Sequence, residues 1–451
     1  MARLSEKIGY GLGDWASSMF WKIFSYYLPF FYSNIFGLTL KDAALLLLVT
    51  KIYDAVTDPM MGVIADRTRT RWGRYRPWLL WMALPFAVIG VLTFTTPMAS
   101  YSGKLVWAYA TYLAMMTAYT AINVPYGAML GVVTVDSREK TVFSSYRMFF
   151  AYAGSFVAVA MFEPLVNLTG GGSSGWQRAM IVVGAIVMVL FWGCFALTHE
   201  HVKPAAEREN GSVGRDLLHL ATNGPWWILF AAAIGVLIFN SIRGGAAAYF
   251  FKDFVDGAPL MSNVVFTAGL FLAVGEIANM LGVVLAVPLS AKFGKKRTYI
   301  GAIAVTAILG AAFFFVPATV TGYWTMLALQ IVISVAAGVT FPLLWSMYAD
   351  VADHSELRHG RASTGLIFSS SSMAQKFGGA LGSALILWLL AAFGYDTAGG
   401  ATQSAEAITG VRLLMSWIPA AGSVIAAVAM MFYPLNEARI SLIEKELKAR
   451  R

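Results

Sequence analysis

Charged residues are scarce in this sequence, and their scarcity excludes an ordinary soluble domain. They make up 13% of the chain, whereas apolar residues make up 58%. A typical soluble domain carries about 25% charged residues. The charges that are present lie mainly in short segments between long apolar stretches. This pattern predicts an all-α integral membrane protein, with the lipid bilayer as its surroundings.

Cysteine is almost absent, and the residue patterns of enzymes are missing. Cys194 is the single cysteine, which excludes an intrachain disulfide. The sequence has no nucleophile–base pair, no metal-ligand spacing and no phosphate-binding loop. The glycines of Gly9-Tyr-Gly-Leu-Gly follow no strand, so they do not predict a nucleotide-binding turn. We therefore expect neither enzymatic activity nor a cofactor.

Twelve apolar stretches are long enough to cross a bilayer, which takes about 18 residues or more. We predict one helix for each stretch. The predicted spans are residues 10–36, 43–65, 77–97, 104–133, 145–168, 178–198, 225–251, 261–290, 298–317, 322–349, 363–394 and 408–434.

The basic residues predict how these spans are oriented. Most of the 33 Lys and Arg residues fall on one side of the membrane, and loops rich in Lys and Arg face the cytoplasm. An even number of spans returns the chain to the side on which it began. We expect a multi-pass protein of the cell inner (plasma) membrane with both termini in the cytoplasm. The net charge of +9 is then a topology signal and not a sign of nucleic-acid binding.

A polar segment divides the spans into six and six. We predict an N-terminal half at 1–198, a cytoplasmic linker at 199–223, a C-terminal half at 224–435 and a cytoplasmic tail at 436–451. A short basic turn with a glycine follows the second span of each half, at Gly73-Arg-Tyr-Arg and at Gly294-Lys-Lys-Arg. Parallel repeats of six spans are the plan of the major facilitator fold, which binds its substrate between the halves near the membrane midplane.

Two carboxylates lie inside the second span. Asp54 and Asp58 are four residues apart, so both lie on one face of a helix. A carboxylate is costly in hydrocarbon and must face a partner, a cavity or a cation. Lys51 could form a salt bridge within the helix. Because one lysine cannot neutralise both carboxylates, we expect a site for Na⁺ or H⁺, in which oxygen ligands would suit a hard cation.

Polar residues in the first and fourth spans indicate a hydroxylated ligand. Asp14 either caps the first helix or accepts two hydrogen bonds from neighbouring sugar hydroxyls. In the fourth span Pro125 interrupts the helix, and Thr120 and Asn123 can face the same cavity because they are three residues apart. Thr120 would also suit a packing role. Asn123 is therefore the better candidate for ligand contact.

Three basic residues lie within later spans: Arg147, Arg243 and Lys376. Lys376 lies too deep in its span to reach the membrane surface easily. We expect it to pair with Asp54 or Asp58 across the two halves, in a bridge that responds to cation and sugar. A static structural pair is the alternative.

Several segments resemble the glycoside–pentoside–hexuronide:cation symporter family. The resemblance rests on Asp54-Ala-Val-Thr-Asp-Pro-Met-Met-Gly, on Gly9-Tyr-Gly-Leu-Gly-Asp and on Asn123-Val-Pro-Tyr-Gly. It covers essentially the whole chain. The resemblance implies a monomeric twelve-helix facilitator that carries a sugar or glycoside together with Na⁺, Li⁺ or H⁺ by alternating access.

The resemblance also implies two sets of functional residues. Asp54, Asp58 and Thr120 would bind the cation, as metal ligands if the ion is Na⁺, with Lys376 nearby. The sugar pocket would be lined by Asp14, Tyr119, Asn123 and Arg147. We add Arg243 and Lys376 to the substrate-binding candidates because their charges lie inside predicted spans.

The chain departs from the best-known member of that family at three positions. It has Gly13 in place of a lysine, Asn123 in place of an aspartate that contacts galactosides, and Gly127 in place of a tryptophan. The lost aspartate argues against that member's own galactoside, and the lost tryptophan widens the pocket for a larger glycoside. A lysolipid or other amphiphile is the alternative substrate. The sequence leaves a neutral glycoside and a hexuronide open, as well as Na⁺ and H⁺.

Overall fold

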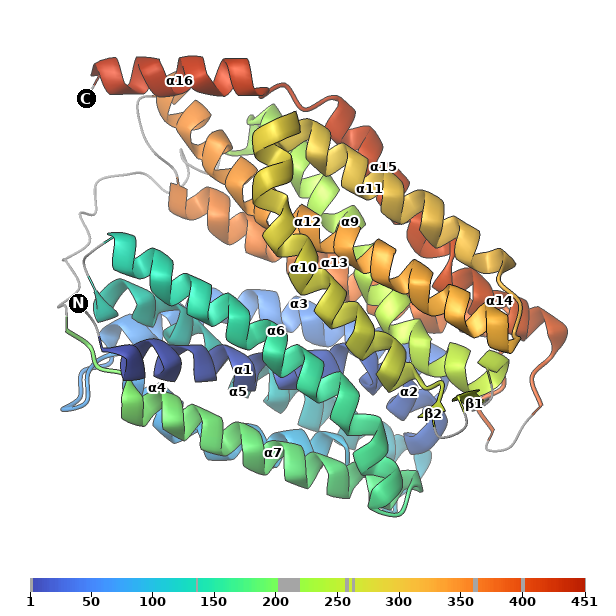
Figure 1. Ribbon diagram of the computed structural model, residues 1–451. Coiled ribbons are helices and arrows are strands. Elements are labelled where there is room, and N and C mark those ends of the chain that lie inside the picture. Colours follow the sequence, from blue (N-terminus) through green and yellow to red (C-terminus); the bar gives the residue numbers. More distant parts are fainter. Residues whose placement is uncertain are drawn as a thin grey trace. The chain divides into compact units, whose positions relative to one another are not determined.

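The computed structural model describes residues 3–134, 137–201, 220–255, 259–261, 264–359, 364–398 and 402–450, and these are almost entirely helical (Figure 1). The strands in this part of the chain are β1 (Pro259–Met261) and β2 (Val264–Val265), a short antiparallel pair. A helix satisfies its backbone hydrogen bonds internally, which lipid requires. The predicted all-α class is confirmed.

Helices cover all six spans predicted for the N-terminal half, drawn from blue to green in Figure 1. Two of them begin at side-chain caps, since Thr39 accepts from the N–H of Asp42 at 3.2 Å and Ser100 from that of Gly103 at 3.3 Å. The elements are α1 (Leu4–Tyr26), α2 (Leu28–Phe30), the π-helix η1 (Phe31–Phe36), α3 (Leu40–Arg67), α4 (Arg76–Thr93), α5 (Tyr101–Val133), α6 (Ser137–Leu168) and α7 (Gly172–Leu197).

Each of the six spans predicted for the C-terminal half contains helix, but the start predicted for the span at 261–290 is wrong, because β1 and β2 occupy that region and the helix begins at Ala268. The elements are α9 (Gly224–Phe250), the π-helix η2 (Phe251–Val255), α10 (Ala268–Phe293), α11 (Lys295–Ala312), the 3₁₀ helix η3 (Phe313–Phe315), α12 (Val320–His359), α13 (Thr364–Ala392), α14 (Ala405–Met415), α15 (Trp417–Met431) and α16 (Glu437–Arg450). The last of these helices lies in the polar tail predicted at 436–451.

Ten stretches of the described residues are long and apolar enough to cross a membrane. Two further predicted spans, at α1 and α3, are helical but fall outside this set. Both carry charges inside the helix, Asp14 and Lys22 in α1 and Lys51, Asp54 and Asp58 in α3. The predicted functional carboxylates are thus among the charges that weaken the membrane signal of these two helices.

The chain folds into two compact units. Unit 1 comprises Met1–Glu207, Thr267–Ala273 and Leu387–Ser404, and unit 2 comprises the remainder. Within unit 1, α1 packs against α6 and α7, and α5 packs against α3 and α4. Within unit 2, α15 packs against α9 and α11 around a core that includes Trp226, Tyr299 and Tyr348. The division at a 199–223 linker stays a prediction, because most of that segment lies outside the described residues.

A carboxylate from the segment after α7 caps the start of α4. Glu200 accepts three backbone hydrogen bonds, at 2.8, 2.7 and 2.9 Å, and the donors are the N–H groups of Arg74, Tyr75 and Arg76. The first N–H groups of a helix lack partners within it and attract negative charge. The turn requires Gly73, whose φ is 115° and whose Cβ, if present, would lie 2.4 Å from the Glu200 carboxyl carbon.

The C-terminal half repeats this cap. Glu437, which follows the last span, accepts a hydrogen bond from the backbone N–H of Lys295 at 2.5 Å. The preceding Gly294 has a φ of 85°, and a Cβ there would lie 2.6 Å from the carboxyl carbon of Glu437. The two caps occupy corresponding places in the two sets of six spans, which supports the internal repeat.

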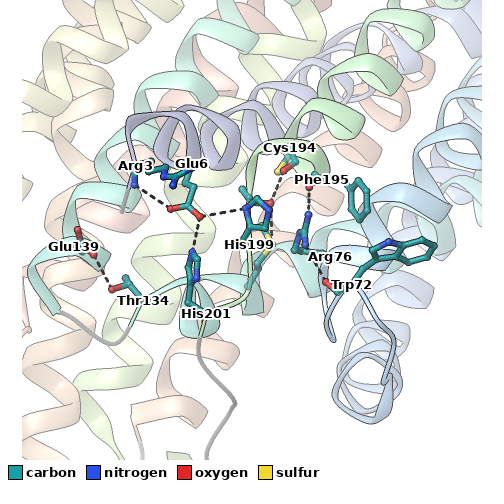
Figure 2. Close-up of polar contacts among 12 residues, drawn as sticks. Arg3, Glu6, Trp72, Arg76, Thr134, Glu139, Cys194, Phe195, His199 and His201 are labelled. Atoms are coloured by element: carbon teal, nitrogen blue, oxygen red, sulfur yellow. Dashed lines mark hydrogen bonds and ion pairs between the residues drawn. The ribbon is translucent and has the colours of Figure 1, made fainter. Parts of the chain in front are cut away.

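Near the α4 cap, two histidines hold the start of α1 (Figure 2). Oε1 of Glu6 lies 2.7 Å from Nε2 of His201 and 3.6 Å from Nδ1 of His199. Its other oxygen accepts from the backbone N–H of Arg3 at 3.2 Å, and the backbone N–H of His201 donates to the carbonyl of Val132 at 2.9 Å. The segment after α7 therefore ties together the ends of α1, α4 and α5.

Opposing influences act on the Glu6 carboxyl, which precedes the predicted first span. Burial alone would raise its pKa. The hydrogen bonds from His201 and Arg3, together with the charges of His201 and His199, outweigh burial and hold the pKa of Glu6 below its usual value. The ionised carboxylate thus stabilises the folded state.

We predict that Glu6→Gln lowers the melting temperature at neutral pH and that this difference from the wild type vanishes in acid. A lowered folded-state pKa contributes stability above the unfolded pKa, about 4.3 for Glu. That contribution is lost as the pH falls through the folded-state value. Thermal unfolding of both proteins in detergent, from neutral pH down to about pH 3, measures the difference between their melting temperatures. A difference that stays constant over this range would contradict the prediction.

Candidate functional site

The two carboxylates of α3 meet one hydroxyl of α5. Asp54 and Asp58 lie about one helical turn apart. Oγ1 of Thr120 lies 2.9 Å from Oδ1 of Asp54 and 2.9 Å from Oδ1 of Asp58. Asp54 and Thr120 are buried, and Asp58 is half-buried. The structure therefore brings together the three residues predicted to bind the cation.

This cluster places one hydroxyl hydrogen between two carboxylates. The hydroxyl of Thr120 carries a single hydrogen, so it donates to one of the two. The second contact is satisfied when the other carboxyl carries a proton, or when a cation lies among the oxygens. Carboxylate and hydroxyl oxygens are the ligands that hard cations prefer. The arrangement therefore suits both H⁺ and Na⁺.

A second charged group joins α1 to α6. Nε of Arg147 donates to Oδ2 of Asp14 at 2.5 Å, and Nη2 donates to Oδ1 at 3.5 Å, so the guanidinium contacts both carboxylate oxygens. The guanidinium carbon also lies 5.3 Å from the ring centroid of Tyr126. Because α1 begins at Leu4, ten residues earlier, the alternative that Asp14 caps this helix is wrong. The pair adds no net charge to the site.

Polar and aromatic side chains connect α1 and α5 beside these groups. Oγ of Ser17 donates to Oδ1 of Asn123 at 2.8 Å, and the ring of Trp21 lies 5.8 Å from that of Tyr119. Asp14, Ser17 and Trp21 lie on one face of α1, because they are three and four residues apart. Ser17 was not among the predicted site residues, although its spacing from Asp14 placed it on the same helix face.

Lys51, one turn before Asp54 on α3, lies against an aromatic ring. Its Nζ is 4.3 Å from the ring centroid of Trp21 and 3.9 Å from Sδ of Met116. A cation over an aromatic face is stabilised by the ring quadrupole. The side chain of Lys51 therefore links α3 to α1 and α5 within unit 1.

The two remaining predicted residues belong to unit 2. Arg243 on α9 is 5% exposed, and its Nε and Nη2 donate to Oε1 of Gln330 at 3.3 and 3.0 Å. Nη1 donates to the carbonyl of Met415. These contacts give Arg243 a packing role between α9, α12 and α14. Lys376 lies on α13, and its pairing with the α3 carboxylates stays a prediction.

Gly13 and Gly127, singled out in the sequence, differ in the space around them. A Cβ at Gly127, one turn after Asn123, would meet no atom of the described residues within 4 Å. A Cβ at Gly13 would lie 2.4 Å from the ring of Tyr126. With respect to the described residues, space is therefore open at Gly127, whereas a larger residue at position 13 would require Tyr126 to move.

Comparison with known proteins gives consistent matches over almost the whole chain. Residues 9–437 match the family model described as MFS/sugar transport protein. The chain is 36% identical to the putative glycoside/cation symporter YagG of Escherichia coli (strain K12), over 98% of this chain and 95% of that protein. It is 32% identical to the isoprimeverose transporter of Lactiplantibacillus pentosus, over 97% of this chain and 90% of that protein.

Solved structures share the fold at low sequence identity. The crystal structure of the nucleoside transporter NupG matches with a TM-score of 0.64 and 18% identity, over 94% of this chain and 98% of that one.

We predict that Thr120→Ala lowers the melting temperature and removes any stabilisation by Na⁺, whereas Thr120→Ser preserves both. The alanine leaves two carboxylate oxygens without their shared hydroxyl, and an unsatisfied buried polar group costs about 1–3 kcal/mol. Thermal unfolding in Na⁺, Li⁺ and choline buffers measures both effects. Thr120→Ala that melts like the wild type and still responds to Na⁺ would refute a role for this hydroxyl.

Proposed function

Because this chain belongs to the MFS/sugar transport protein family, a family of membrane transporters and not of enzymes, we propose that it is a secondary active symporter of a neutral glycoside and a monovalent cation. The predicted twelve-helix facilitator fold is confirmed by the same comparisons. One observation carries the proposal. The hydroxyl that joins the two carboxylates of α3 lies one helical turn from Asn123 on α5.

The cation would bind at Asp54, Asp58 and Thr120. Their oxygens have the chemistry of a Na⁺ site, and protonation of one carboxyl satisfies the same contacts. Na⁺ and H⁺ would therefore compete for the same oxygens of Asp54, Asp58 and Thr120, and the bound ion would be transported together with the glycoside. A relative named as a glycoside/cation symporter supports cation coupling.

The substrate would be neutral. The charge of Arg147 is matched by Asp14 within unit 1, at 2.5 Å, so this site offers hydrogen bonds without a net positive charge. The ring of Trp21 beside Tyr119 offers an aromatic surface of the kind that suits the apolar face of a sugar ring. Open space at Gly127 supports a substrate larger than a monosaccharide. The relative named as an isoprimeverose transporter makes isoprimeverose the first probe.

Cation and glycoside sites on one helix give a route for coupling. Thr120 would respond to the cation and Asn123 to the sugar, and both lie on α5 within one turn. Each ligand would then raise the affinity for the other by the same factor, as linkage requires. We further propose a monomer of the inner membrane with both termini cytoplasmic, which moves its cargo by alternating access.

Thermal unfolding of the purified protein against a ligand panel tests the proposal. The panel holds isoprimeverose, neutral methyl and nitrophenyl glycosides, a glucuronide and a lysophosphatidylcholine, each in Na⁺ or choline at neutral and acidic pH. Binding to the folded state raises the melting temperature by mass action. We expect a neutral glycoside to stabilise the protein, more so in Na⁺ or in acid. Stabilisation by the glucuronide alone, or by the lysolipid alone, would overturn the proposed substrate.

Uptake into proteoliposomes then tests coupling. Accumulation of the stabilising glycoside should follow an imposed Na⁺ or H⁺ gradient and collapse when that gradient is dissipated. Equal accumulation with and without a cation gradient would contradict symport.

We predict that Gly127→Trp weakens binding of disaccharides at least about 10-fold, or about 1.4 kcal/mol, and leaves methyl monosaccharides within about twofold. The indole would fill space that a longer glycoside needs. Gly127→Ala is the matched control, because its Cβ meets nothing within 4 Å among the described residues. Calorimetric titration of all three proteins measures the affinities. Equal losses for disaccharides and monosaccharides would show that this space does not set substrate size.

A further inference from the structure

Ser17 and Asn123 form a hydrogen-bonded chain between α1 and α5. Oγ of Ser17, a buried side chain, donates to Oδ1 of Asn123 at 2.8 Å. Nδ2 of Asn123 donates to the backbone carbonyl of Tyr119 at 3.2 Å, one turn earlier on α5. Ser17 is three residues from Asp14, and Asn123 is three residues from Thr120. These hydrogen bonds therefore lie between the Asp14–Arg147 pair and the α3 carboxylates.

The hydrogen-bond inventory fixes which way the amide of Asn123 faces. A backbone carbonyl only accepts, so the amide atom that faces Tyr119 must be the NH₂ group. The amide oxygen then faces Ser17, and the Ser17 hydroxyl must be the donor because the oxygen carries no hydrogen. Rotating the amide by a half turn would break the bond to Tyr119 and set two acceptors against each other.

The second hydrogen of the amide is the donor that Asn123 can offer to a ligand. The amide oxygen accepts from Ser17 and keeps a second lone pair, one N–H donates to Tyr119, and no described residue accepts from the second N–H. The Asn123 side chain is partly exposed, unlike that of Ser17. An aspartate at this position would present acceptors alone.

We propose that Ser17 is a positioning residue that, together with the Tyr119 carbonyl, holds the Asn123 amide as a hydrogen-bond donor toward the glycoside. This inference rests on the proposed function. The substrate group at Asn123 is then an acceptor, such as the oxygen of a ring hydroxyl. The direction of this one amide, held by Ser17 on one side and by the Tyr119 carbonyl on the other, therefore sets which glycosides bind.

The contact itself is tested without any ligand by a double-mutant cycle in thermal unfolding. Ser17→Ala and Asn123→Ala should each lower the melting temperature. The double variant should melt no lower than the less stable of the two single variants, because both changes remove the same bond. Ser17→Thr, which keeps the hydroxyl, should restore most of the loss. Ser18→Ala is the matched control, since Ser18 lies about 100° further around the helix. Additive losses from Ser17→Ala and Asn123→Ala would overturn the contact.

The donor role is tested with isoprimeverose and its singly deoxygenated and singly fluorinated derivatives. Fluorine accepts weakly and never donates, so at the hydroxyl that faces Asn123 the fluoro sugar should bind the wild type several-fold more tightly than the deoxy sugar. In Ser17→Ala this preference should fall, because only the Tyr119 carbonyl then orients the amide, and a full wild-type preference in this variant would refute the positioning role of Ser17. In Asn123→Asp the preference should reverse, because a carboxylate repels fluorine. A wild type that binds the deoxy sugar more tightly than the fluoro sugar at every hydroxyl of the panel would overturn the proposal.

The two experiments separate failure of the inference from failure of the proposed function. A wild type that binds isoprimeverose but shows no fluoro preference at any hydroxyl refutes the donor role and leaves transport standing. A wild type that binds no sugar of the panel refutes the glycoside function and the donor role with it. The melting cycle still decides whether Ser17 holds the amide.

Discussion

A charge inside a membrane must be neutralised close by, because hydrocarbon solvates it poorly, and the polar groups of unit 1 are arranged around this constraint. Asp14 meets it with a fixed partner, the guanidinium of Arg147 at 2.5 Å. Asp54 and Asp58 share a hydroxyl, which carries no charge of its own. Under the proposed function, a cation bound at Asp54 and Asp58 would alter the local charge there, whereas the charge of Asp14 is matched by Arg147.

Helix α5 gives these two kinds of site a common support. Thr120 faces the carboxylates of α3, and Asn123, one turn later, bonds to Ser17 of α1. Pro125 follows at once and removes one backbone donor from the helix. A small change in the path of α5 near this proline would displace both side chains together. Under the proposed function, the spacing of Thr120 and Asn123 along one helix would link the binding of ion and sugar.

The sequence predicted the membrane class, the spans and the acidic pair, because each depends on local spacing. Asp54 and Asp58 are four residues apart, and any helix brings such residues to one face. The Asp14–Arg147 pair joins residues 133 positions apart, and helical periodicity predicts contacts only between residues a few positions apart. Ser17 was missed for a different reason: its spacing placed it on the face of Asp14, but a serine in a membrane helix can bond to its own backbone, so spacing alone does not indicate a bond to another helix. Thr120 was predicted as a cation ligand from the family resemblance and not from spacing.

The cap at the start of α4 has a consequence for when each half can complete its fold during synthesis. Its carboxylate, Glu200, lies 124 residues after Arg76, whose N–H it accepts. At about 5–20 residues per second, the ribosome needs roughly 6–25 s to supply it. The cap on α11 waits for Glu437, which is 142 residues beyond Lys295. Each basic turn therefore closes after the last span of its own half has been synthesised, so each half reaches its final form as a unit.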